Sequence, residues 1–320
     1  MSLLQVKNLK MYYDVLRGHV KAVDDVTFEI KKGDSLGLAG ESGCGKTSAA
    51  LAIMRLLPQN GKIVEGKIIF NGEDLVPLSD KEIRHRIRWK KISVIFQGAM
   101  NALHPIKKIG DQIAEAIILH DSVGKKEAME RVGKLLDLVG IGASKKDRYP
   151  HELSGGMKQR SMIAMALACN PDLIIADEPT TALDVIIEAQ VLKVIQELQQ
   201  KLSLSMILIS HDLSMIAETC NRVAIMYAGK IVEYGGAVSV FKEASHPYTQ
   251  KLLAAFPSIL GRKTELSSIH GFPPDLLNPP SGCRFHPRCD SAMEICKEKE
   301  PEMLELSSKG HYAACHLFSR

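Results

Sequence analysis

The segment Gly40-Glu41-Ser42-Gly43-Cys44-Gly45-Lys46-Thr47 constrains the fold more than any other part of the sequence. A short apolar run, Leu36 to Ala39, precedes it, and an Ala/Leu/Met-rich stretch that favours a helix follows it. A glycine-rich turn in this setting exposes successive backbone N–H groups, and the positive end of the helix dipole adds to their field. The pattern predicts a strand, a phosphate-binding loop and a helix, in a chain that binds a nucleoside triphosphate.

Individual residues of this loop have expected contacts. Lys46 would add a positive charge beside the β- and γ-phosphates, and the Thr47 hydroxyl can reach Mg²⁺. Cys44 lies beside Lys46 and the helix start, which predicts a lowered thiol pKa and ready alkylation; alternatively, its side chain fills a position that needs a small residue. The candidate phosphate-binding residues are Gly40, Ser42, Gly43, Cys44, Gly45, Lys46, Thr47 and Ser48.

Two further segments carry chemistry of the same kind. The apolar run Leu173 to Ala176 ends in Asp177 and Glu178, of which one carboxylate can hold Mg²⁺ and the next can polarise a water molecule. The segment Leu153-Ser154-Gly155-Gly156-Met157-Lys158-Gln159-Arg160 begins an apolar helix without a preceding strand. It also presents free N–H groups, so the chain carries two helix starts that can bind anions.

Composition limits the classes of function. The length of 320 residues exceeds one typical core, which predicts at least two domains. The net charge is only +4, from 41 basic and 37 acidic residues, and gives no reason to propose nucleic acid as a partner. The basic run Lys81 to Lys91 fits a solvated helix face. We find neither an apolar stretch long enough to span a membrane nor a signal peptide. If the protein acts with a membrane pore, that pore would be a separate chain.

The chain divides by its pattern into three parts. Residues 1–97 and 170–235 alternate strands with helices, which predicts an α/β fold with a P-loop (RecA-like) mixed sheet. This sheet would have an antiparallel edge formed by Leu4 to Met11 and Val20 to Ile30. Residues 98–169 lack such strands and predict a helical subdomain, which carries the segment around Ser154 at its exit.

The last part, residues 236–320, turns proline-rich and ends in a cysteine cluster, which predicts a small C-terminal cysteine-rich domain. The clustered cysteines are Cys283, Cys289, Cys296 and Cys315, separated by five, six and eighteen residues. In a reducing compartment such a cluster favours a metal over disulfides. The gaps exceed those of tight zinc knuckles, but spacing alone leaves an iron–sulfur cluster, a zinc site and unliganded thiols open.

Over residues 1 to about 255 these motifs, in this order, resemble the nucleotide-binding subunit of an ABC transporter. The resemblance identifies Leu153 to Arg160 as the signature motif, with Ser154, Gly155, Gly156 and Gln159 as nucleotide contacts. It implies a Q-loop glutamine at Gln97, a D-loop at Thr181-Ala182-Leu183-Asp184 and a switch histidine at His211. Tyr13 is the candidate for stacking on adenine, with Tyr12 as its competitor. The expected Mg²⁺ ligands are Thr47, Gln97 and Asp177, and the expected catalytic residues are Glu178, His211, Gln97 and Asp184.

The segments His246-Pro247-Tyr248-Thr249 and Pro279 to Cys289 resemble the C-terminal extension of ATPases from dipeptide and oligopeptide importers. This resemblance implies a [4Fe–4S] cluster on the four cysteines, with Zn²⁺ as the alternative. It also implies two polytopic membrane permease subunits, a second ATPase subunit that is a paralogue, and, indirectly, an extracytoplasmic peptide-binding protein. The chain would then lie peripherally on the cytoplasmic face of the cell membrane.

The two anion-binding helix starts imply a mechanism. If a helical subdomain separates them, the phosphate loop and the signature motif cannot reach the same nucleotide within one chain. We therefore expect ATP between two chains, bound by Lys46 and Thr47 of one and by Ser154 and Gly156 of the other, with closure driven by ATP. The alternatives are a soluble ABC ATPase not tied to transport and a nucleotide-bound iron–sulfur sensor. Because the cysteines follow the whole ATPase core, we expect tail and motor to be separable.

Overall fold

The computed structural model describes residues 2–98, 102–181, 183–255, 269–306 and 310–319. These residues form two compact units. The signature unit contains residues 31–34 and 77–208, and the phosphate-loop unit contains residues 2–30, 35–76 and 209–320.

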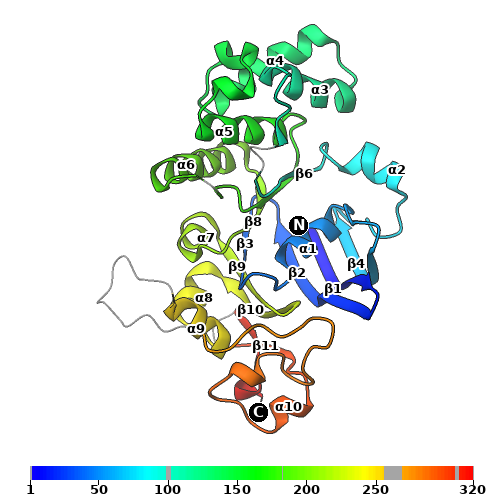
Figure 1. Ribbon diagram of the computed structural model, residues 1–320, viewed down its shortest axis with the longest axis vertical. Coiled ribbons are helices and arrows are strands. Elements are labelled where there is room, and N and C mark those ends of the chain that lie inside the picture. The colour runs from blue at the N-terminus through cyan, green and yellow to red at the C-terminus, as the bar shows by residue number, and fades with distance from the viewer. Residues whose placement is uncertain (1, 99–101, 182, 256–268, 307–309, 320) are drawn as a thin grey trace. The chain divides into compact units, whose positions relative to one another are not determined.

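The phosphate-loop unit is built around strands that carry the phosphate loop and its support. Strand β3 is buried throughout, as its apolar sequence predicts, and pairs in parallel with β9. Strand β9 pairs with β10 in antiparallel orientation. Helix α1 follows the loop, as predicted, and α7, α8 and α9 follow later in the chain (Figure 1). The bounds are β3 Ser35–Ala39, α1 Lys46–Ile53, α7 Leu213–Thr219, β9 Arg222–Tyr227, β10 Lys230–Gly236, α8 Ala237–Lys242 and α9 Pro247–Ala254.

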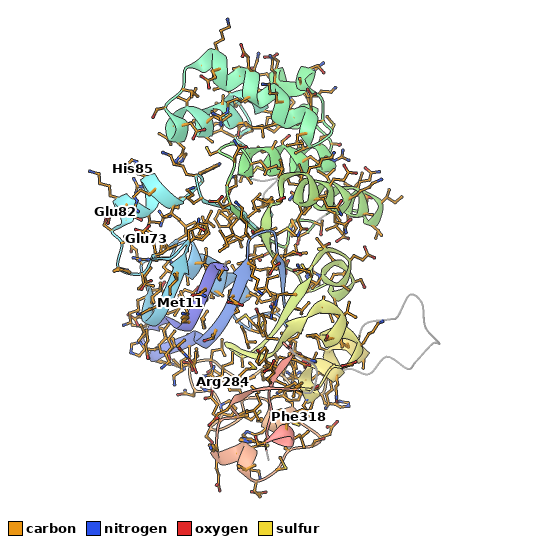
Figure 2. The ribbon with its side chains drawn as sticks, turned by 180° about the vertical axis from the view of Figure 1, so that it is seen from behind. Met11, Glu73, Glu82, His85, Arg284 and Phe318 are labelled. Atoms are coloured by element: carbon orange, nitrogen blue, oxygen red, sulfur yellow. The ribbon has the colours of Figure 1, made fainter. Side chains whose placement is uncertain are left out.

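The N-terminal strands differ from the prediction. Instead of forming an edge of the sheet that contains β3, they lie in a separate four-stranded sheet with the order β2-β1-β4-β5. Strand β1 pairs with β4 in antiparallel orientation, with Leu4 opposite Phe70. The apolar alternation identified both strands, and β1 and β2 are neighbours, but the sheet that they join is completed by β4, which follows the phosphate loop. The bounds are β1 Ser2–Val15, β2 Gly18–Lys31, β4 Gly61–Phe70 and β5 Glu73–Asp74. Met11 of β1 is labelled in Figure 2.

The cysteine-rich segment joins the same unit. Strand β12 pairs with β10 in antiparallel orientation, and β11 pairs with β12. The extension therefore adds strands to the sheet that contains β9 and β3, and the structure does not set it apart as a domain of its own. The bounds are α10 Ile295–Glu298, β11 Met303–Glu305 and β12 Tyr312–Ala314.

The signature unit combines three strands with the predicted helices. Strands β6 and β7 are parallel, with Ile95 opposite Ala176, and β8 is the next strand in the order. Helices α3, α4 and α5 pack together (Figure 1). The bounds are α2 Asp80–Glu82, β6 Ile92–Ile95, α3 Ile109–Asp121, α4 Lys125–Leu138, α5 Gly155–Ala166, β7 Leu173–Asp177, α6 Val185–Leu202 and β8 Ser205–Ile209, of which the first four residues belong to this unit. The two units together confirm a mixed α/β fold.

The basic run between 81 and 91 forms α2 and a π-helical turn, Ile83–Ile87. Its charges are partly paired on the surface, Arg84 with Asp80 at 3.0 Å and Arg88 with the same carboxylate at 3.1 Å. Glu82 and His85 on this segment are labelled in Figure 2. Such exposed pairs contribute little to stability, in keeping with a solvated face. Among the helices of the described residues, none is long and apolar enough to cross a membrane.

Candidate nucleotide site

The phosphate loop has a backbone that requires glycine. Gly40, Gly43 and Gly45 have positive φ angles of 147°, 79° and 107°. A Cβ on Gly40 would lie 2.1 Å from the carbonyl oxygen of Met226, and one on Gly45 would lie 2.1 Å from that of Ala22. Larger residues are excluded at both positions, and the loop is free to turn its N–H groups to one side.

Lys46 begins helix α1 and is 7 % exposed. Its Nζ donates hydrogen bonds to the carbonyl oxygens of Gly40 at 2.7 Å and Glu41 at 3.0 Å, so the ammonium group lies across its own loop. Ser42 and Thr47 are exposed. The arrangement combines a helix N-terminus, a buried lysine and exposed hydroxyl groups, which is the chemistry that a triphosphate and its cation need.

The prediction of a lowered thiol pKa for Cys44 is wrong. The residue is 4 % exposed, and burial raises the pKa of its thiol although Lys46 acts in the opposite direction. Its Sγ lies 3.6 Å from Lys46 Nζ, and a Cβ on Gly40 would lie 2.9 Å from it. The side chain is therefore packed under the loop instead of facing the free N–H groups, and desolvation outweighs the helix start. The alternative interpretation, a position that needs a small residue, fits this packing.

The two candidate tyrosines have different surroundings. The Tyr12 hydroxyl donates to Asp24 at 2.7 Å, and burial and this bond raise its pKa. The Tyr13 hydroxyl lies 3.1 Å from the Oγ of Ser48, the third residue of the helix that follows the loop. Tyr13 is thus the tyrosine of the pair that the structure brings to the start of α1. Its stacking on adenine remains a prediction.

In the signature unit the structure brings Gln97 and Glu178 together. Gln97 follows β6 and Glu178 follows the neighbouring strand β7, so both lie at the carboxyl edge of this pair. Gln97 Nε2 donates to Glu178 Oε2 at 2.8 Å, and the Thr181 hydroxyl donates to the same oxygen at 3.0 Å. Glu178 has a φ of 47°, a left-handed conformation that is uncommon outside glycine. Asp177 is 3 % exposed at the end of β7.

The signature segment also has the predicted form. Ser154 is the N-cap of α5, and its Oγ accepts a hydrogen bond from the N–H of Met157 at 3.4 Å. Gly156 packs so closely that a Cβ would lie 2.6 Å from Ile187 Cγ2. Ser154 and Gly155 are exposed, whereas Gln159 is 3 % exposed. The N-cap and the first helical residue are thus exposed, whereas Gly156 and Gln159 are packed.

The remaining motif residues lie at element boundaries. Asp184 caps α6 and accepts from the N–H of Ile187 at 3.0 Å. Ala182 of the same D-loop lies outside the described residues. His211 is exposed after β8 and belongs to the phosphate-loop unit. The catalytic roles of Asp184 and His211 remain predictions.

The four clustered cysteines are neighbours in the phosphate-loop unit. Burial raises the pKa of Cys283 to about 11, and the other three thiols contribute to the shift. Burial also raises the pKa of Cys289 and Cys315, and Cys296 adds to both shifts. Within the described residues no group of three or more His, Cys, Asp or Glu side chains is arranged to hold a metal ion. Thiolates are ligands for iron and zinc alike. A bound metal ion would also stabilise the thiolate forms, which burial alone disfavours.

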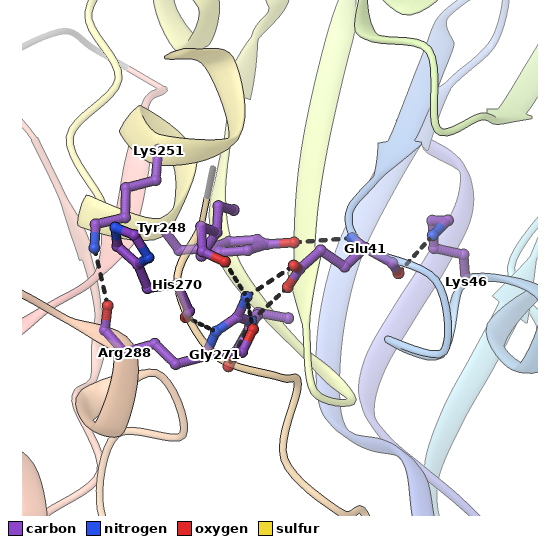
Figure 3. A network of polar contacts seen from close by, with 9 residues as sticks. Glu41, Lys46, Tyr248, Lys251, His270, Gly271 and Arg288 are labelled. Atoms are coloured by element: carbon purple, nitrogen blue, oxygen red, sulfur yellow. Dashed lines mark hydrogen bonds and ion pairs between the residues drawn. The ribbon is translucent and has the colours of Figure 1, made fainter. Parts of the chain in front are cut away.

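A group of residues that supports the phosphate loop was not predicted from the sequence. Figure 3 shows Arg288 beside the carboxylate of Glu41, and Tyr248 beside the backbone of the same residue. Arg288 Nη1 and Nη2 lie 2.7 and 2.9 Å from the two carboxylate oxygens, and the N–H of Glu41 donates to the Tyr248 hydroxyl at 2.8 Å. The residues are 247 and 207 positions apart, so no local pattern could pair them. The sequence feature that could have indicated this contact is the presence of two arginines between Cys283 and Cys289.

Fold and motifs define an ABC-type ATPase, and the comparisons agree. The family model "ABC transporter" matches residues 23–181. A dimeric structure of the ATP-binding cassette MJ0796, bound to ADP and Pi, superposes with a TM-score of 0.65 at 25 % identity, covering 73 % of this chain and 98 % of that one. CbiO1 from Clostridium perfringens superposes with a TM-score of 0.66 at 28 % identity, covering 76 % and 91 %.

Sequence relatives narrow the class. The model "Oligopeptide/dipeptide transporter, C-terminal region" matches residues 232–296. The oligopeptide transport ATP-binding protein OppD of Bacillus subtilis is 48 % identical, over 97 % of this chain and 87 % of the relative. The dipeptide transport protein DppD of the same species is 46 % identical over 99 % and 95 %, and OppD of Escherichia coli is 44 % identical over 98 % and 93 %. The chain belongs to the family of ATP-binding subunits of oligopeptide and dipeptide ABC transporters.

Proposed function

We propose that the protein is the ATP-hydrolysing subunit that powers import of dipeptides or oligopeptides by an ABC transporter. The observation that carries this proposal is the extent of the similarity, which covers nearly the whole chain and includes a match to the C-terminal region of peptide transporters. An ATPase motif alone would leave the transported substrate open.

The roles of the site residues follow from their chemistry. Lys46 and the loop N–H groups bind the phosphates, and Glu178, held by Gln97 and Thr181, orients the attacking water. Thr47, Gln97 and Asp177 would hold Mg²⁺, which neutralises phosphate charge. His211 and Asp184 complete the catalytic set, and Tyr13 stacks on adenine.

ATP is bound between this chain and a second ATPase subunit, whose signature motif supplies the serine and glycines that correspond to Ser154, Gly155 and Gly156. The exposed N-terminus of α5 supports this role, because a helix start open to solvent can accept the phosphate of a nucleotide held by another chain. The dimeric state of the related cassette that binds ADP and Pi supports it as well. Binding of ATP closes the dimer, and hydrolysis reopens it.

The parts of the chain have separate tasks in this proposal. Residues 1–97 and 170–235 form the nucleotide-binding core, and residues 98–169 form the helical subdomain that passes closure to the membrane subunits. Residues 236–320 form the extension specific to peptide importers. The partners are two polytopic permease subunits, a paralogous ATPase and, indirectly, an extracytoplasmic peptide-binding protein. The chain lies on the cytoplasmic face of the membrane.

Purification of the tagged chain from its own cells, in mild detergent, tests the assignment. We expect two polytopic membrane proteins and a second ATPase to co-purify, and the complex to hydrolyse ATP faster when peptide-loaded binding protein is added. Cells that carry Glu178→Gln should lose uptake of a labelled dipeptide or oligopeptide. Isolation of a monomer or homodimer that hydrolyses ATP at full rate, without membrane partners, would favour a soluble ABC ATPase.

We propose further that Cys283, Cys289, Cys296 and Cys315 hold a [4Fe–4S] cluster, with Zn²⁺ as the alternative. The support is that Cys289, Cys296 and Cys315 lie close enough to Cys283 to raise the pKa of its thiol, in a segment with few apolar residues for a core of its own. Protein prepared without oxygen should be brown, with about four irons and four sulfides per chain. Colourless protein with one zinc per chain would change the assignment from an iron–sulfur cluster to a zinc site. Protein that contains neither metal would exclude both assignments.

A further inference from the structure

The segment Cys283-Arg284-Phe285-His286-Pro287-Arg288-Cys289 carries two arginines that point toward the strands of the ATPase core. Arg284, labelled in Figure 2, donates to the carboxylate of Asp24 and to the carbonyl oxygen of Ala228. Arg288 forms a bidentate ion pair with Glu41, the second residue of the phosphate loop (Figure 3). A residue of the cysteine-rich extension thus contacts the ATP site itself.

Arg288 is held in place by much more than this ion pair. Its side chain is 5 % exposed, and Nη1 also donates to the Tyr227 hydroxyl at 3.2 Å. Nε donates to the carbonyl oxygen of His270 at 3.0 Å, and Nη2 to those of Ile269 and Gly271 at 3.4 and 3.3 Å. The bond to Glu41 raises the pKa of Arg288 further. The guanidinium group is therefore a fixed positive charge at this position.

Glu41 is held at each of its polar groups. Its N–H donates to Tyr248, its carbonyl oxygen accepts from Lys46 Nζ at 3.0 Å, and its carboxylate is bound by Arg288. The carboxylate side chain is 24 % exposed, so water screens its charge only in part. A negative charge at this position opposes the binding of a polyanion by the same loop, unless a neighbouring positive charge compensates it.

We propose that Arg288 is a positioning residue for ATP binding, which neutralises Glu41 and keeps its carboxylate bound at the side of the phosphate loop. The C-terminal extension thereby contributes to the affinity of the site for ATP. Loss of Arg288 leaves an unpaired carboxylate in the loop, and ATP binds more weakly for an electrostatic reason. The inference rests on the assignment of residues 40–47 as the phosphate site of the proposed function.

Binding of Mg-ATP to the full-length chain, measured by calorimetry, tests the proposal. Arg288→Gln should raise the Kd about tenfold, the size of effect expected from one partly screened charge. Glu41→Gln, which removes the carboxylate, should change the Kd less than about threefold. The double variant should return to within about threefold of the wild-type Kd, because the charge that Arg288 compensates has been removed.

This rescue separates charge compensation from a purely structural role. If Arg288 merely held the extension on the core, Glu41→Gln would not restore binding in the Arg288→Gln background, and the double variant would bind as weakly as the single one. That outcome overturns the proposal. Arg288→Lys keeps the charge without the bidentate geometry and should raise the Kd only about threefold. Should Arg288→Gln fail to fold, Arg288→Met replaces it in the cycle, because it also removes the positive charge.

His311→Asn serves as the matched control. His311 also belongs to the extension and is bound by a buried bond, 2.8 Å from its Nε2 to Glu233, but that bond involves β10 and not the phosphate loop. We expect this variant to lower the temperature of unfolding and to leave the Kd for Mg-ATP unchanged. A weakening equal to that of Arg288→Gln would mean that any loosening of the extension affects ATP binding, and would contradict the specific role of Arg288.

Lys46→Ala distinguishes failure of this inference from failure of the proposed function. It should abolish measurable ATP binding, since it removes the charge that the loop directs at the phosphates. Full ATP affinity in Lys46→Ala would overturn the assignment of the site. Loss of binding in Lys46→Ala together with wild-type affinity in Arg288→Gln would overturn only the inference about Arg288.

Discussion

The two helix starts that can bind phosphate are built in opposite ways. At α1, Lys46 is buried and lies across its own loop, and carbonyl oxygens leave no room for a side chain at two of the loop glycines. Glu41 is bound by residues more than 200 positions away. At α5, the N-cap Ser154 is exposed, and its bond to Met157 is local. The first start depends on many tertiary contacts of its unit, whereas the cap of the second is local and its close tertiary contact is that of Gly156 with Ile187.

The difference fits the tasks proposed for the two sites. A loop that binds the triphosphate within its own chain gains from preorganisation, because each fixed N–H group lowers the entropy cost of binding. A helix start that meets the nucleotide of another chain must remain open until that chain arrives. We therefore expect changes around α1 to affect ATP binding and stability together, and changes at Ser154 to act locally.

The largest expected effect separates binding from chemistry. Glu178→Gln should lower ATP turnover at least about a hundredfold, because the amide cannot take up a proton from the attacking water. The contacts of Lys46 and the loop remain, so Mg-ATP should still bind. Turnover of the purified complex and calorimetric binding to the chain check the two halves. Wild-type turnover in this variant would exclude Glu178 as the base.

The support of the phosphate loop should weaken in acid. His246 caps α9, and its Nδ1 accepts from the N–H of Tyr248, the residue that holds Glu41. Burial lowers its pKa to about 3, below the unfolded value of about 6.5, so the unfolded chain binds the extra proton. The stability from this group is complete above about pH 6.5 and is lost as the pH falls toward about 3.

Between about pH 7 and about pH 5, the free energy of unfolding measured in urea should therefore fall by about 2 kcal/mol more in the wild type than in His246→Asn. The Asn side chain does not titrate in this range. The Asn variant also keeps a side-chain oxygen that can cap α9. Parallel pH dependences in the two proteins would show that His246 is not the residue that senses acid.

The burial of the phosphate loop is tested by Cys44. Its raised pKa and 4 % exposure predict alkylation by iodoacetamide at least about tenfold slower than in the unfolded chain. Mass spectrometry of the peptide that contains Cys44 gives both rates, and the less buried Cys289, measured after treatment with a chelator, serves as an internal reference. Rapid labelling that Mg-ATP suppresses would restore the picture of a reactive thiol facing the phosphates.

The smallest effect concerns the local cap. Ser154→Ala should lower the free energy of unfolding by about 1 kcal/mol, because the N–H of Met157 loses its acceptor. Ser154→Gly should lower the free energy of unfolding by only about 0.3 kcal/mol, since glycine is tolerated at an N-cap. Chemical denaturation measures both. A loss several times larger in Ser154→Ala would mean that this helix start also depends on tertiary contacts.

Much of the site could be predicted from the sequence because its motifs are local. The strand, loop and helix around Lys46, the carboxylates after β7 and the capped start of α5 each depend on neighbouring residues. The sheet to which the N-terminal strands belong was predicted wrongly, because their further partner β4 follows the phosphate loop in the sequence. The expectation that the C-terminal extension is separable from the ATPase core did not include the pairing of Arg288 with Glu41, because these residues are 247 positions apart in the sequence.

Cys44 illustrates the limit most clearly. Its neighbours in the sequence, a lysine and a helix start, favour a thiolate, and the sequence by itself determined those neighbours. The direction in which the side chain points was decided by tertiary packing, which buries it under the loop and raises the pKa of its thiol. Sequence determined which groups form the candidate nucleotide site, whereas tertiary structure decided their solvation and their distant partners, because desolvation and ion pairing depend on distances in space.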